Sequence, residues 1–576
     1  MIRLMRYARP YAWAALAVIA LVAVQSISQL YLPALMGEIV DRGVATQDIP
    51  FIWSSGAKML LVAAISAVAA LIAGYLSARI SSGFGRDLRS RVFGRVESFS
   101  LREFDEIGTA SLIVRTTNDV TQIQGVSLMI LRMVVMAPIM AVGGIIMAAA
   151  EDTGLSWVLL VAIPVLFLGM AVVALRGLPL FRVMQTKLDR LNLVLRERLT
   201  GVRVIRAFNR VDYEKRRFND ANYDLTATAL TVHRLMSVLM PFMSFTLNLT
   251  TIAIVWFGAQ RVSTGDLRVG SMMAFIQYAM QILMSLLMTA SIFVMLPRAA
   301  ASAERVNQVL DSQPAIVDPP TPAQPDASAA GTLEFVGVTF NYPGAEAPAL
   351  QDINLTIRPG ETVAIIGGTG SGKSTLVNLI PRFYDVTKGQ LLVDGVDVRQ
   401  MTQAALRAKI GLVPQRAVLF TGTVADNIRY GKEDATDAEV RDAATVAQAI
   451  DFIEAMPDGF ASMITQGGTN VSGGQKQRIS IARALVRRPP IYIFDDSFSA
   501  LDFRTDARLR AALHKVTAGA TTLTVTQRVG VAMDADRIVV LADGQVAGVG
   551  THRELMRSSP VYREIVVSQL PEEEIA

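Results

Sequence analysis

Six long apolar runs occupy the first half of the chain. They cover Pro10–Gly37, Met59–Ala78, Met133–Ala150, Gly154–Leu175, Leu235–Gln260 and Val269–Pro297. A helix needs roughly 20 mostly apolar residues to cross the hydrocarbon core of a bilayer. The pattern therefore predicts six membrane-spanning helices, with both ends of this half on the same side of the membrane.

Basic residues divide the connecting loops into two classes. Arginines precede the first run, fill the connection between the second and third runs and recur throughout residues 176–234. The opposite loops carry only Arg42, Lys58, Arg261 and Arg268. Because cytoplasmic loops carry an excess of Lys and Arg, we expect the termini and both long loops to be cytoplasmic.

Composition supports a bilayer protein and excludes several kinds of site. Hydrophobic residues make up 52% of the 576 residues and charged residues only 18%, which is too apolar for a soluble enzyme. A net charge of +5 gives no argument for a nucleic-acid partner. The absence of cysteine excludes disulfides, thiolate metal sites and thiol nucleophiles. We expect no cleavable signal, because the first apolar run is far longer than a signal sequence requires.

The second half reads as a separate α/β domain. Five prolines fall within Asp311–Gly331, which is typical of a linker. Short β-branched runs then alternate with helical stretches and glycine turns. We predict an all-α membrane domain of six helices over residues 1–310, a linker over 311–330 and a C-terminal α/β P-loop domain over 331–576.

A glycine-rich loop indicates nucleotide binding. It follows the apolar run Val363–Ile366, opens a helix and consists of Gly367, Gly368, Thr369, Gly370, Ser371, Gly372, Lys373, Ser374 and Thr375. Glycines let backbone N–H groups close on phosphates, and the helix N-terminus favours negative charge. We expect Lys373 to pair with the β- and γ-phosphates of ATP and the Ser374 hydroxyl to ligate Mg²⁺.

An acidic residue more than 100 positions further along the chain fits the same site. Asp495 ends the apolar strand Ile491–Phe494, where it is well placed to ligate Mg²⁺. Hydrophobic strands that end in Asp are common, so this feature alone is weak evidence. Together with the glycine-rich loop it predicts a site for ATP and Mg²⁺.

The segment Val471–Arg478 resembles the signature motif of ATP-binding cassette (ABC) transporters, with Val471 in place of the usual Leu. The chain as a whole resembles exporters in which six membrane helices precede one nucleotide-binding domain. In that family the signature of one subunit closes over the γ-phosphate bound to the other subunit. The resemblance therefore assigns Ser472, Gly473, Gly474 and Gln475 to ATP binding across a dimer.

The same resemblance assigns roles to further residues. Tyr342 is similar to the aromatic residue that stacks on adenine, and Gln415 to the glutamine that touches Mg²⁺ and the membrane domain. Ser499–Asp502 matches the D-loop. We expect the long inner loops, at Phe104–Asp119 and Leu199–Phe208, to contact the ATP-binding half. Within them, the segments around Gly108–Asp119 and Gly201–Phe208 are similar to the coupling segments of these exporters.

Two positions depart from the family pattern. Asp496 stands where the family has a catalytic Glu, and Gln527 stands where it has a switch His. A positioned general base typically gives roughly 10²–10⁴-fold, and Gln cannot titrate near neutrality as His can. We therefore predict Asp496, Gln527 and Gln415 as the catalytic residues and expect slow hydrolysis. ATP binding should suffer less, because the glycine-rich loop with Lys373, Asp495 and Tyr342 remains.

This paired departure resembles the degenerate half of heterodimeric ABC exporters. It implies a partner subunit that has the Glu and the His, and whose hydrolytic site the Ser472–Gln475 signature completes. The alternatives are a self-sufficient homodimeric exporter, possibly a lipid floppase, an ATP-gated regulator or channel, and an importer that uses the exporter fold. A bacterial inner membrane, with the nucleotide-binding domain in the cytoplasm, is the simplest location.

Two methionine stripes suggest a path for cargo. They comprise Met129, Met133, Met136, Met140 and Met147 on one apolar run, and Met273, Met280, Met284, Met288 and Met295 on another. Their spacing places each set on one helical face. Methionine suits surfaces that accept varied apolar shapes, so the stripes fit a cavity for an amphipathic drug or lipid, although helix packing explains them equally well. Arg132, Gln277 and Gln281 could add polar contacts.

Overall fold

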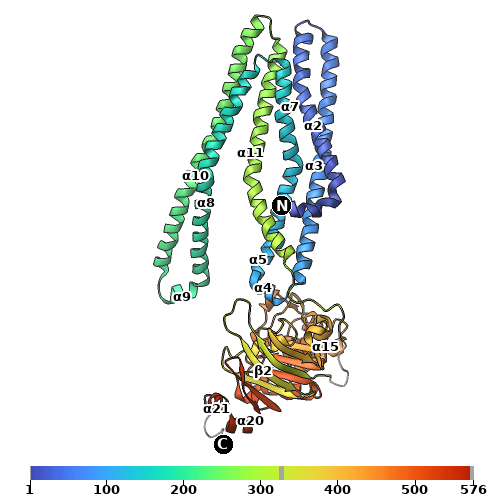
Figure 1. Ribbon diagram of the computed structural model, residues 1–576, viewed down its shortest axis with the longest axis vertical. Helices are drawn as coiled ribbons and strands as arrows, with labels where there is room; N and C mark the ends of the chain where they lie inside the picture. Colours follow the sequence, from blue (N-terminus) through green and yellow to red (C-terminus); the bar gives the residue numbers. More distant parts are fainter. Residues whose placement is uncertain (1, 324–329, 571–576) are drawn as a thin grey trace. The chain divides into compact units, whose positions relative to one another are not determined.

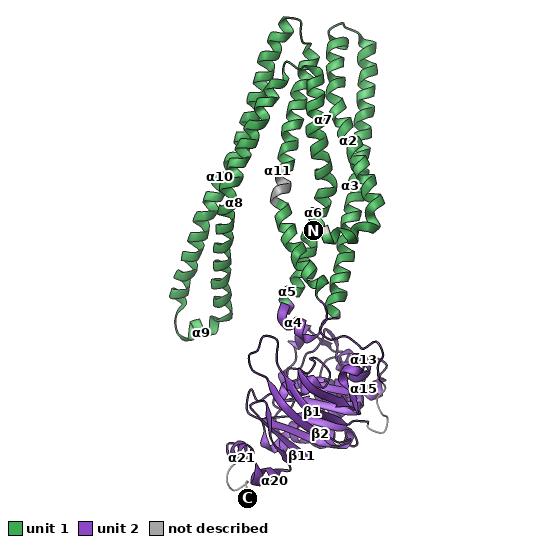
Figure 2. Ribbon diagram, in the orientation of Figure 1, with its two compact units in different colours: residues 1–97, 110–312 green, residues 98–109, 313–576 purple. Residues whose placement is uncertain are grey.

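The computed structural model describes residues 2–323 and 330–570, and the chain divides into two compact units. One unit comprises Met1–Glu97 and Ala110–Ser312, and the other comprises Ser98–Thr109 and Gln313–Ala576 (Figure 2). The short segment Ser98–Thr109 lies in the first inner loop of the membrane half, yet it packs as part of the second unit.

The first unit is built from long helices. In the described residues, six helical segments are long and apolar enough to cross a membrane, which confirms the fold predicted from the apolar runs. The elements are α1 (Ile2–Met5), η1 (Arg6–Tyr11), α2 (Ala12–Glu38), η2 (Ile39–Val44), α3 (Ile49–Glu97), α5 (Thr109–Val114), η3 (Arg115–Asp119), α6 (Val120–Met129), η4 (Ile130–Val134), α7 (Val135–Glu151), α8 (Ser156–Thr200), α9 (Val202–Ala207), α10 (Val211–Ser263) and α11 (Val269–Asp311).

The helices of this unit form two groups. Helices α2, α3, α7 and α11 pack on one another, and Tyr278 is fully buried there and donates a hydrogen bond to the Leu30 carbonyl (3.0 Å). Helices α8 and α10 run side by side as a pair (Figure 1). The 53 residues of α10 give roughly 80 Å of helix, far more than the 30 Å hydrocarbon core requires. The long helices therefore extend well beyond the membrane.

The second unit contains two main sheets. In its described part, a four-stranded antiparallel sheet has the order β2-β1-β4-β5, and a six-stranded sheet has the order β12-β11-β3-β10-β9-β6, in which only β12 pairs antiparallel. The strands are β1 (Leu333–Phe340), β2 (Leu350–Ile357), β3 (Thr362–Gly367), β4 (Lys388–Val393), β5 (Val396–Asp397), β6 (Ile410–Val413), β9 (Ile491–Asp495), β10 (Thr521–Val525), β11 (Arg537–Ala542) and β12 (Gln545–Gly550). A short ribbon pairs β7 (Gly422–Thr423) with β8 (Met463–Ile464).

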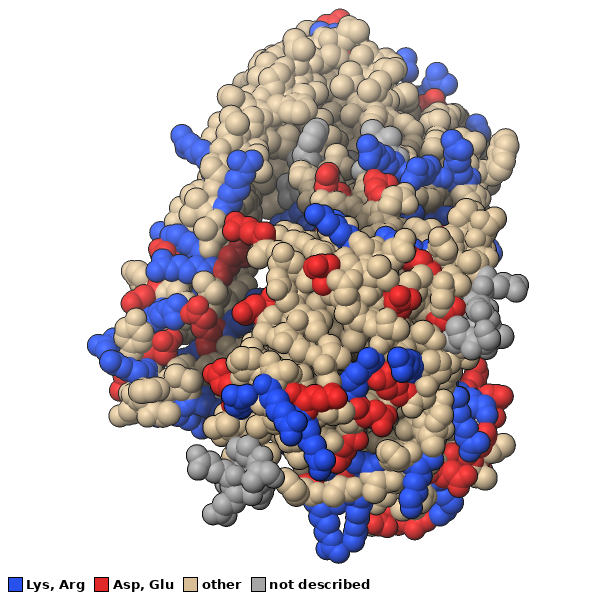
Figure 3. Space-filling view, turned by 60° about the horizontal axis from the view of Figure 1, so that its bottom comes forward, with Lys and Arg blue, Asp and Glu red and all other residues tan. Residues whose placement is uncertain are grey.

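Helices cover these sheets, as expected for parallel strands that are apolar on both faces. The α-helices in the described part of this unit are α4 (Leu101–Ile107), α12 (Lys373–Leu379), α13 (Gln403–Ala408), α14 (Val424–Arg429), α15 (Asp437–Val446), α16 (Ile450–Glu454), α17 (Gly473–Leu485), α18 (Phe503–Val516), α19 (Val529–Ala532), α20 (His552–Ser558) and α21 (Pro560–Val567). Figure 3 shows acidic and basic side chains interspersed on the face that it presents. The parallel strands β3, β9 and β10 end at one edge, where open α/β sheets bind ligands.

Candidate functional site

The glycine-rich loop follows β3 and wraps around the side chain of Lys373. The Lys373 ammonium donates hydrogen bonds to the carbonyls of Gly367 (2.9 Å) and Gly368 (2.6 Å). Gly372 has a φ of +96°, and a Cβ there would lie 2.7 Å from Leu350 Cδ2. Only glycine fits this turn, which turns the chain directly into α12.

The electrostatics of Lys373 suit an anionic ligand. Its side chain is 8% exposed, and burial lowers the pKa of its ammonium, while the carboxylates of Asp496 and Asp495 act in the opposite direction. A cation that has lost most of its water interacts strongly with any anion that reaches it. The start of α12 adds the favourable dipole of a helix N-terminus.

Two oxygen-bearing side chains that could ligate a metal ion, Ser374 and Asp495, are in contact next to Lys373. The Ser374 hydroxyl donates to Asp495 Oδ1 (3.1 Å), and Asp495 is 7% exposed at the end of β9. Burial raises the pKa of Asp495, with Asp496 adding to this effect, while Ser374 and Lys373 oppose it. Such oxygens suit Mg²⁺, which proteins usually bind through one or two carboxylates together with substrate phosphates.

Ser374 and Asp495 provide too few oxygen ligands to hold a metal ion without further oxygens from a phosphate. Among the residues that the structure describes, no cluster of three His, Cys, Asp or Glu side chains could hold a metal ion by itself. Ser374 and Asp495 supply only part of a coordination shell. The residues present therefore fit a Mg²⁺ ion that also takes oxygens from a nucleotide.

The next acidic residue stands at a strained point of the backbone. Asp496 has a φ of +44°, in the left-handed region that Asp tolerates better than most residues. Its Oδ2 accepts a hydrogen bond from Gln415 Nε2 (3.4 Å). The structure thus brings together the carboxylate and the amide that the sequence assigned to the catalytic group.

Tyr342 also lines the pocket. Its hydroxyl lies 3.0 Å from Thr375 Oγ1, and its ring packs edge-on against the rings of Phe340 and Tyr384. The cavity has a volume of about 390 Å³. It is lined by Tyr342, Ala349, Thr369, Gly370, Gly372, Lys373, Ser374, Thr375, Gln415, Asp495, Asp496, Val525, Thr526 and Gln527.

The signature residues do not line this cavity. Ser472 caps α17 through a capping box: Gln475 N–H donates to Ser472 Oγ (3.3 Å), and Ser472 N–H donates to Gln475 Oε1 (2.8 Å). A Cβ on Gly474 would lie 3.2 Å from the Ala500 carbonyl, next to the D-loop. Within this chain, Ser472–Gln475 therefore form a structured helix start that is separate from the pocket.

Sequence reasoning missed several residues of the site. Ala349, Val525 and Thr526 line the cavity. Arg528 joins the loop that carries Gln527 to the Ser499 carbonyl, and Gln569 bonds the Gln527 carbonyl. Val525 and Thr526 were detectable, because Val525 ends an apolar strand of the same sheet and Thr526 follows it. Gln569 was not, because it lies 42 residues from Gln527 in the sequence.

The methionine stripes meet in the membrane unit. A cavity of about 180 Å³ is lined by Met136, Met140, Met280, Gln281, Met284, Ser285 and Met288, from α7 and α11. Of the predicted polar contacts, Gln281 lies in this cavity, whereas Arg132 and Gln277 are exposed and do not line it. The structure thus brings part of both stripes to one cavity.

A larger cavity of about 650 Å³ lies among α8, α10 and α11. Phe167, Met170 and Met236 belong to its apolar wall, and Arg182 and Arg298 also line it. In the described residues neither arginine forms an ion pair. This combination of apolar walls and unpaired cations suits an amphipathic anion.

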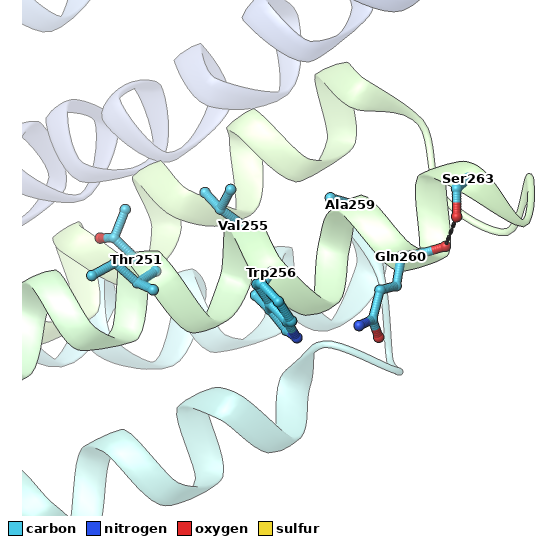
Figure 4. Close-up of a pocket in the computed structure, with 7 residues that line it drawn as sticks. Thr251, Val255, Trp256, Ala259, Gln260 and Ser263 are labelled. Carbon is cyan, nitrogen blue, oxygen red and sulfur yellow. Dashed lines mark hydrogen bonds between the residues drawn. The ribbon is translucent and has the colours of Figure 1, made fainter.

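A third pocket lies on α10 alone. Figure 4 shows Thr251, Val255, Trp256, Ala259, Gln260 and Ser263 along one helix. Trp256 is 65% exposed near the end of the span, a position typical of aromatic anchors at a membrane interface. This surface is therefore assigned to contact with lipid.

Two family models match the chain. The ABC transporter transmembrane region matches residues 15–286, and the ABC transporter model matches residues 350–499. The first match covers the apolar runs up to the sixth. The second extends from β2 through the glycine-rich loop and the signature to the start of the D-loop.

Relatives resemble the chain along most of its length. An uncharacterized ABC transporter ATP-binding protein of Mycobacterium tuberculosis is 46% identical, with 98% of this chain and 97% of the relative covered. An ATP-dependent lipid A-core flippase of Dechloromonas aromatica is 32% identical, covering 99% and 98%. A fatty acid ABC transporter ATP-binding/permease protein of Mycobacterium bovis is 35% identical, covering 83% and 75%.

A solved structure shares the fold. A bacterial Atm1-family ABC exporter with ATP bound superimposes with a TM-score of 0.80 and 26% sequence identity, covering 98% of this chain and 99% of the other. The agreement therefore extends over both the helical unit and the α/β unit.

Proposed function

This chain belongs to the ABC transporter family, as an ATP-driven half-transporter of the exporter type, and on that premise we propose that it is the degenerate subunit of a heterodimeric exporter. The observation that carries the proposal is the composition of one pocket. It holds Lys373, Ser374 and Asp495 for ATP and Mg²⁺, but Asp496 and Gln527 where the family uses Glu and His.

The residues that would bind ATP and Mg²⁺ match the family pattern, whereas the residues that would handle the proton of the attacking water do not. Lys373 holds the phosphates, Ser374 and Asp495 hold Mg²⁺, and Tyr342 stacks on the adenine ring. Asp496 is one methylene shorter than Glu, and a misplacement of about 1 Å can cost roughly 10²-fold in rate. Gln527 can donate a hydrogen bond to a phosphate oxygen but cannot take up the proton of an attacking water.

The signature gives the subunit a second task. Ser472–Gln475 lie outside the pocket of their own chain and form a capped helix start. Such an N-terminus favours an anion, and we assign it to the terminal phosphate of ATP bound by the partner subunit. The chain thereby retains ATP at its own site and completes the site at which the partner hydrolyses ATP.

The test is the ATPase rate of the purified chain alone, followed by co-purification from the native membrane. We expect slow turnover by the isolated chain, tight ATP binding, and a co-purifying ABC subunit with Glu and His at the corresponding positions. A normal exporter rate from the isolated chain would refute the heterodimer.

A self-sufficient homodimer is the second candidate. It is favoured by the hydrogen bond from Gln415 to the Asp496 carboxylate, which holds an acidic group inside the pocket. In that case two identical sites hydrolyse ATP, and each Ser472–Gln475 signature serves the other copy. The isolated chain would then be an active dimer, and Asp496→Asn would abolish its turnover.

For the cargo we propose an amphipathic lipid or acyl compound with an acidic head. The cavity of about 650 Å³ combines apolar walls with Arg182 and Arg298, and the methionine cavity can accept varied apolar shapes. Two relatives carry the names lipid A-core flippase and fatty acid transporter. Cargo-stimulated ATPase with palmitate should weaken severalfold in Arg182→Gln and Arg298→Gln. Arg176→Gln, on the same helix but outside the cavity, should respond as the native chain does.

The protein is an integral membrane protein. We propose a bacterial inner membrane, with the ATP-binding unit in the cytoplasm, because the Arg-rich loops identify the cytoplasmic side. Protease treatment of inverted and right-side-out vesicles distinguishes the two orientations. Cleavage of the ATP-binding unit only in inverted vesicles is the expected result.

A further inference from the structure

The loop that carries Gln527 is held from one side by Arg528. Arg528 Nη2 donates to the Ser499 carbonyl in the D-loop (2.9 Å), and the Arg528 N–H donates to Thr526 Oγ1 (3.0 Å). The first of these contacts joins the loop to the D-loop, and the second lies within the loop itself. They leave the backbone of Gln527 itself to a different partner.

That partner is the side-chain amide of Gln569. Its Nε2 donates to the Gln527 carbonyl (2.7 Å), and its Oε1 accepts from the Val529 N–H (3.0 Å). One amide therefore bonds an acceptor and a donor of the same loop, on both sides of Arg528. Val529 begins α19, so the amide oxygen also satisfies one of the donors that a helix start leaves unpaired.

Gln569 is positioned by a well-packed helix. It follows α21, whose Tyr562 and Val566 are fully buried against Val529 and the strands β3 and β11. The Gln569 N–H donates to the Val566 carbonyl (3.0 Å), which continues the helical turn. The amide is thus presented from the turn that directly follows a well-packed helix.

We propose that Gln569 is a positioning residue for nucleotide hydrolysis. By clamping the backbone on both sides of Arg528, it sets where the Gln527 side chain stands in the nucleotide pocket. The C-terminal helix α21 then acts on the step at the terminal phosphate without touching the nucleotide. The proposal rests on the proposed function only in placing Gln527 beside that phosphate.

The test compares Gln569→Ala, Gln569→Glu and Ser568→Ala in the full-length protein. Ser568 is the adjacent exposed residue. Among the residues that the structure describes, its hydroxyl bonds only the Ile565 carbonyl, so it serves as the matched control. Each change is made both in the native chain and in the Asp496→Glu/Gln527→His chain. The measurements are the Kd of Mg²⁺-ATP, kcat, KM and the thermal midpoint of unfolding.

We expect Gln569→Ala to lower kcat about 10-fold, in line with the cost of small misplacements, while Kd changes less than about twofold. Gln569→Glu should lose as much at neutral pH, because a carboxylate oxygen then faces the Gln527 carbonyl. Its activity relative to the parent should recover as the pH falls, because a protonated Glu can donate again. Ser568→Ala should match its parent.

The proposal is overturned if Gln569→Ala weakens ATP binding and lowers the thermal midpoint as much as it lowers kcat. An unchanged kcat would overturn it as well. So would a Gln569→Glu variant whose activity does not recover at low pH. The result is independent of the degenerate-site proposal. That proposal concerns the absolute rate of the native chain, whereas this one concerns the ratio of each variant to its own parent. If Gln569→Ala does not fold, the pH profile of Gln569→Glu still shows whether the amide positions the loop of Gln527.

Discussion

At the level of single residues, the pocket separates groups that hold charge from groups that would move a proton. Lys373 is buried and bonded to two loop carbonyls, and Ser374 and Asp495 are bonded to each other. Asp496 and Gln527 line the same cavity. Asp496 is one methylene shorter than Glu, and Gln527 lacks the titratable group of His. Small changes at these two positions should therefore have large effects on the rate of ATP hydrolysis.

The double substitution Asp496→Glu with Gln527→His should activate hydrolysis by the isolated chain. We expect about a 100-fold gain in kcat, since a positioned general base gives roughly 10²–10⁴-fold. The Kd of Mg²⁺-ATP should change little, because Lys373, Ser374 and Asp495 are untouched. Steady-state phosphate release and equilibrium ATP binding measure the two quantities.

Each single substitution should give less than the pair, because both residues act on the same step. A large gain from Gln527→His alone would show that Asp496 is already an adequate base. Lys373→Met in the activated chain is the control, and it should abolish the gained rate together with ATP binding.

At the level of elements, helix starts carry both stability and function. Capping boxes begin α17 at Ser472 and α15 at Thr436, with the same pattern of bonds in each. The first belongs to the signature, and the second lies on a different helix that does not line the nucleotide cavity. Substituting each capping residue in turn distinguishes the contribution of a cap to stability from the role of Ser472 at a phosphate.

Ser472→Ala and Thr436→Ala should each lower the stability of the ATP-binding unit by about 1 kcal/mol, the usual cost of removing such a cap. Only Ser472→Ala should also reduce ATP turnover by the complete transporter, because its hydroxyl belongs to the signature. Thermal unfolding and phosphate release are the measurements. Equal effects of both variants on turnover would contradict the role of Ser472.

The C-terminal helices should confer a pH dependence on stability. His552 Nδ1 lies 2.8 Å from the Tyr562 hydroxyl, and burial lowers the pKa of His552, with Arg553 adding to the effect. A lowered pKa means that the unfolded chain binds the proton more readily. Stability is therefore complete above the unfolded value of about 6.5 and is lost as the pH falls below it.

Between pH 7.5 and 5.5, the native protein should lose more of its thermal midpoint than His552→Gln, which cannot take up a proton. His514→Gln, on an exposed position of α18, serves as the control and should keep the native pH dependence. Equal pH dependence in the native protein and His552→Gln would refute the assignment.

At the level of the whole molecule, a segment of the first inner loop is bonded within the second unit. The Tyr384 hydroxyl donates to Asp105 Oδ2 (2.6 Å), and Glu103 Oε1 accepts from the Ala315 N–H (3.0 Å). Burial raises the pKa of Tyr384, and Asp105 raises it further, so the phenol stays a donor. Its ring contacts Tyr342, which lines the same pocket as Lys373.

Tyr384→Phe should therefore weaken communication between ATP and the membrane helices while leaving ATP binding intact. We expect cargo-stimulated ATPase to fall severalfold at an unchanged Kd for Mg²⁺-ATP, because only the bond to Asp105 is removed. Glu106→Gln is the control, since its partner is Arg102 on the same exposed helix. A loss in Glu106→Gln equal to that in Tyr384→Phe would assign the effect to α4 stability instead.

Local patterns allowed much of the site to be predicted. The glycine-rich loop, Asp495 and Gln415 lie together in one cavity, because each lies at or just after the C-terminal end of a parallel strand in the same sheet. Ser472–Gln475 were assigned to ATP as well, but they lie outside this cavity. Whether they reach a second nucleotide depends on a partner, so that assignment remains a prediction, as does a contact of Leu199–Phe208 with the ATP-binding half.

The sequence by itself determined six spans and an α/β ATP-binding domain, because hydrophobic length and glycine spacing act over short stretches of chain. Only the tertiary structure decided that residues 98–109 pack with the ATP-binding unit, that the methionines of α7 and α11 share a cavity, and that Gln569 bonds the loop of Gln527. These contacts join residues far apart along the chain. Their geometry depends on how helices and sheets pack, which no local pattern of residues specifies.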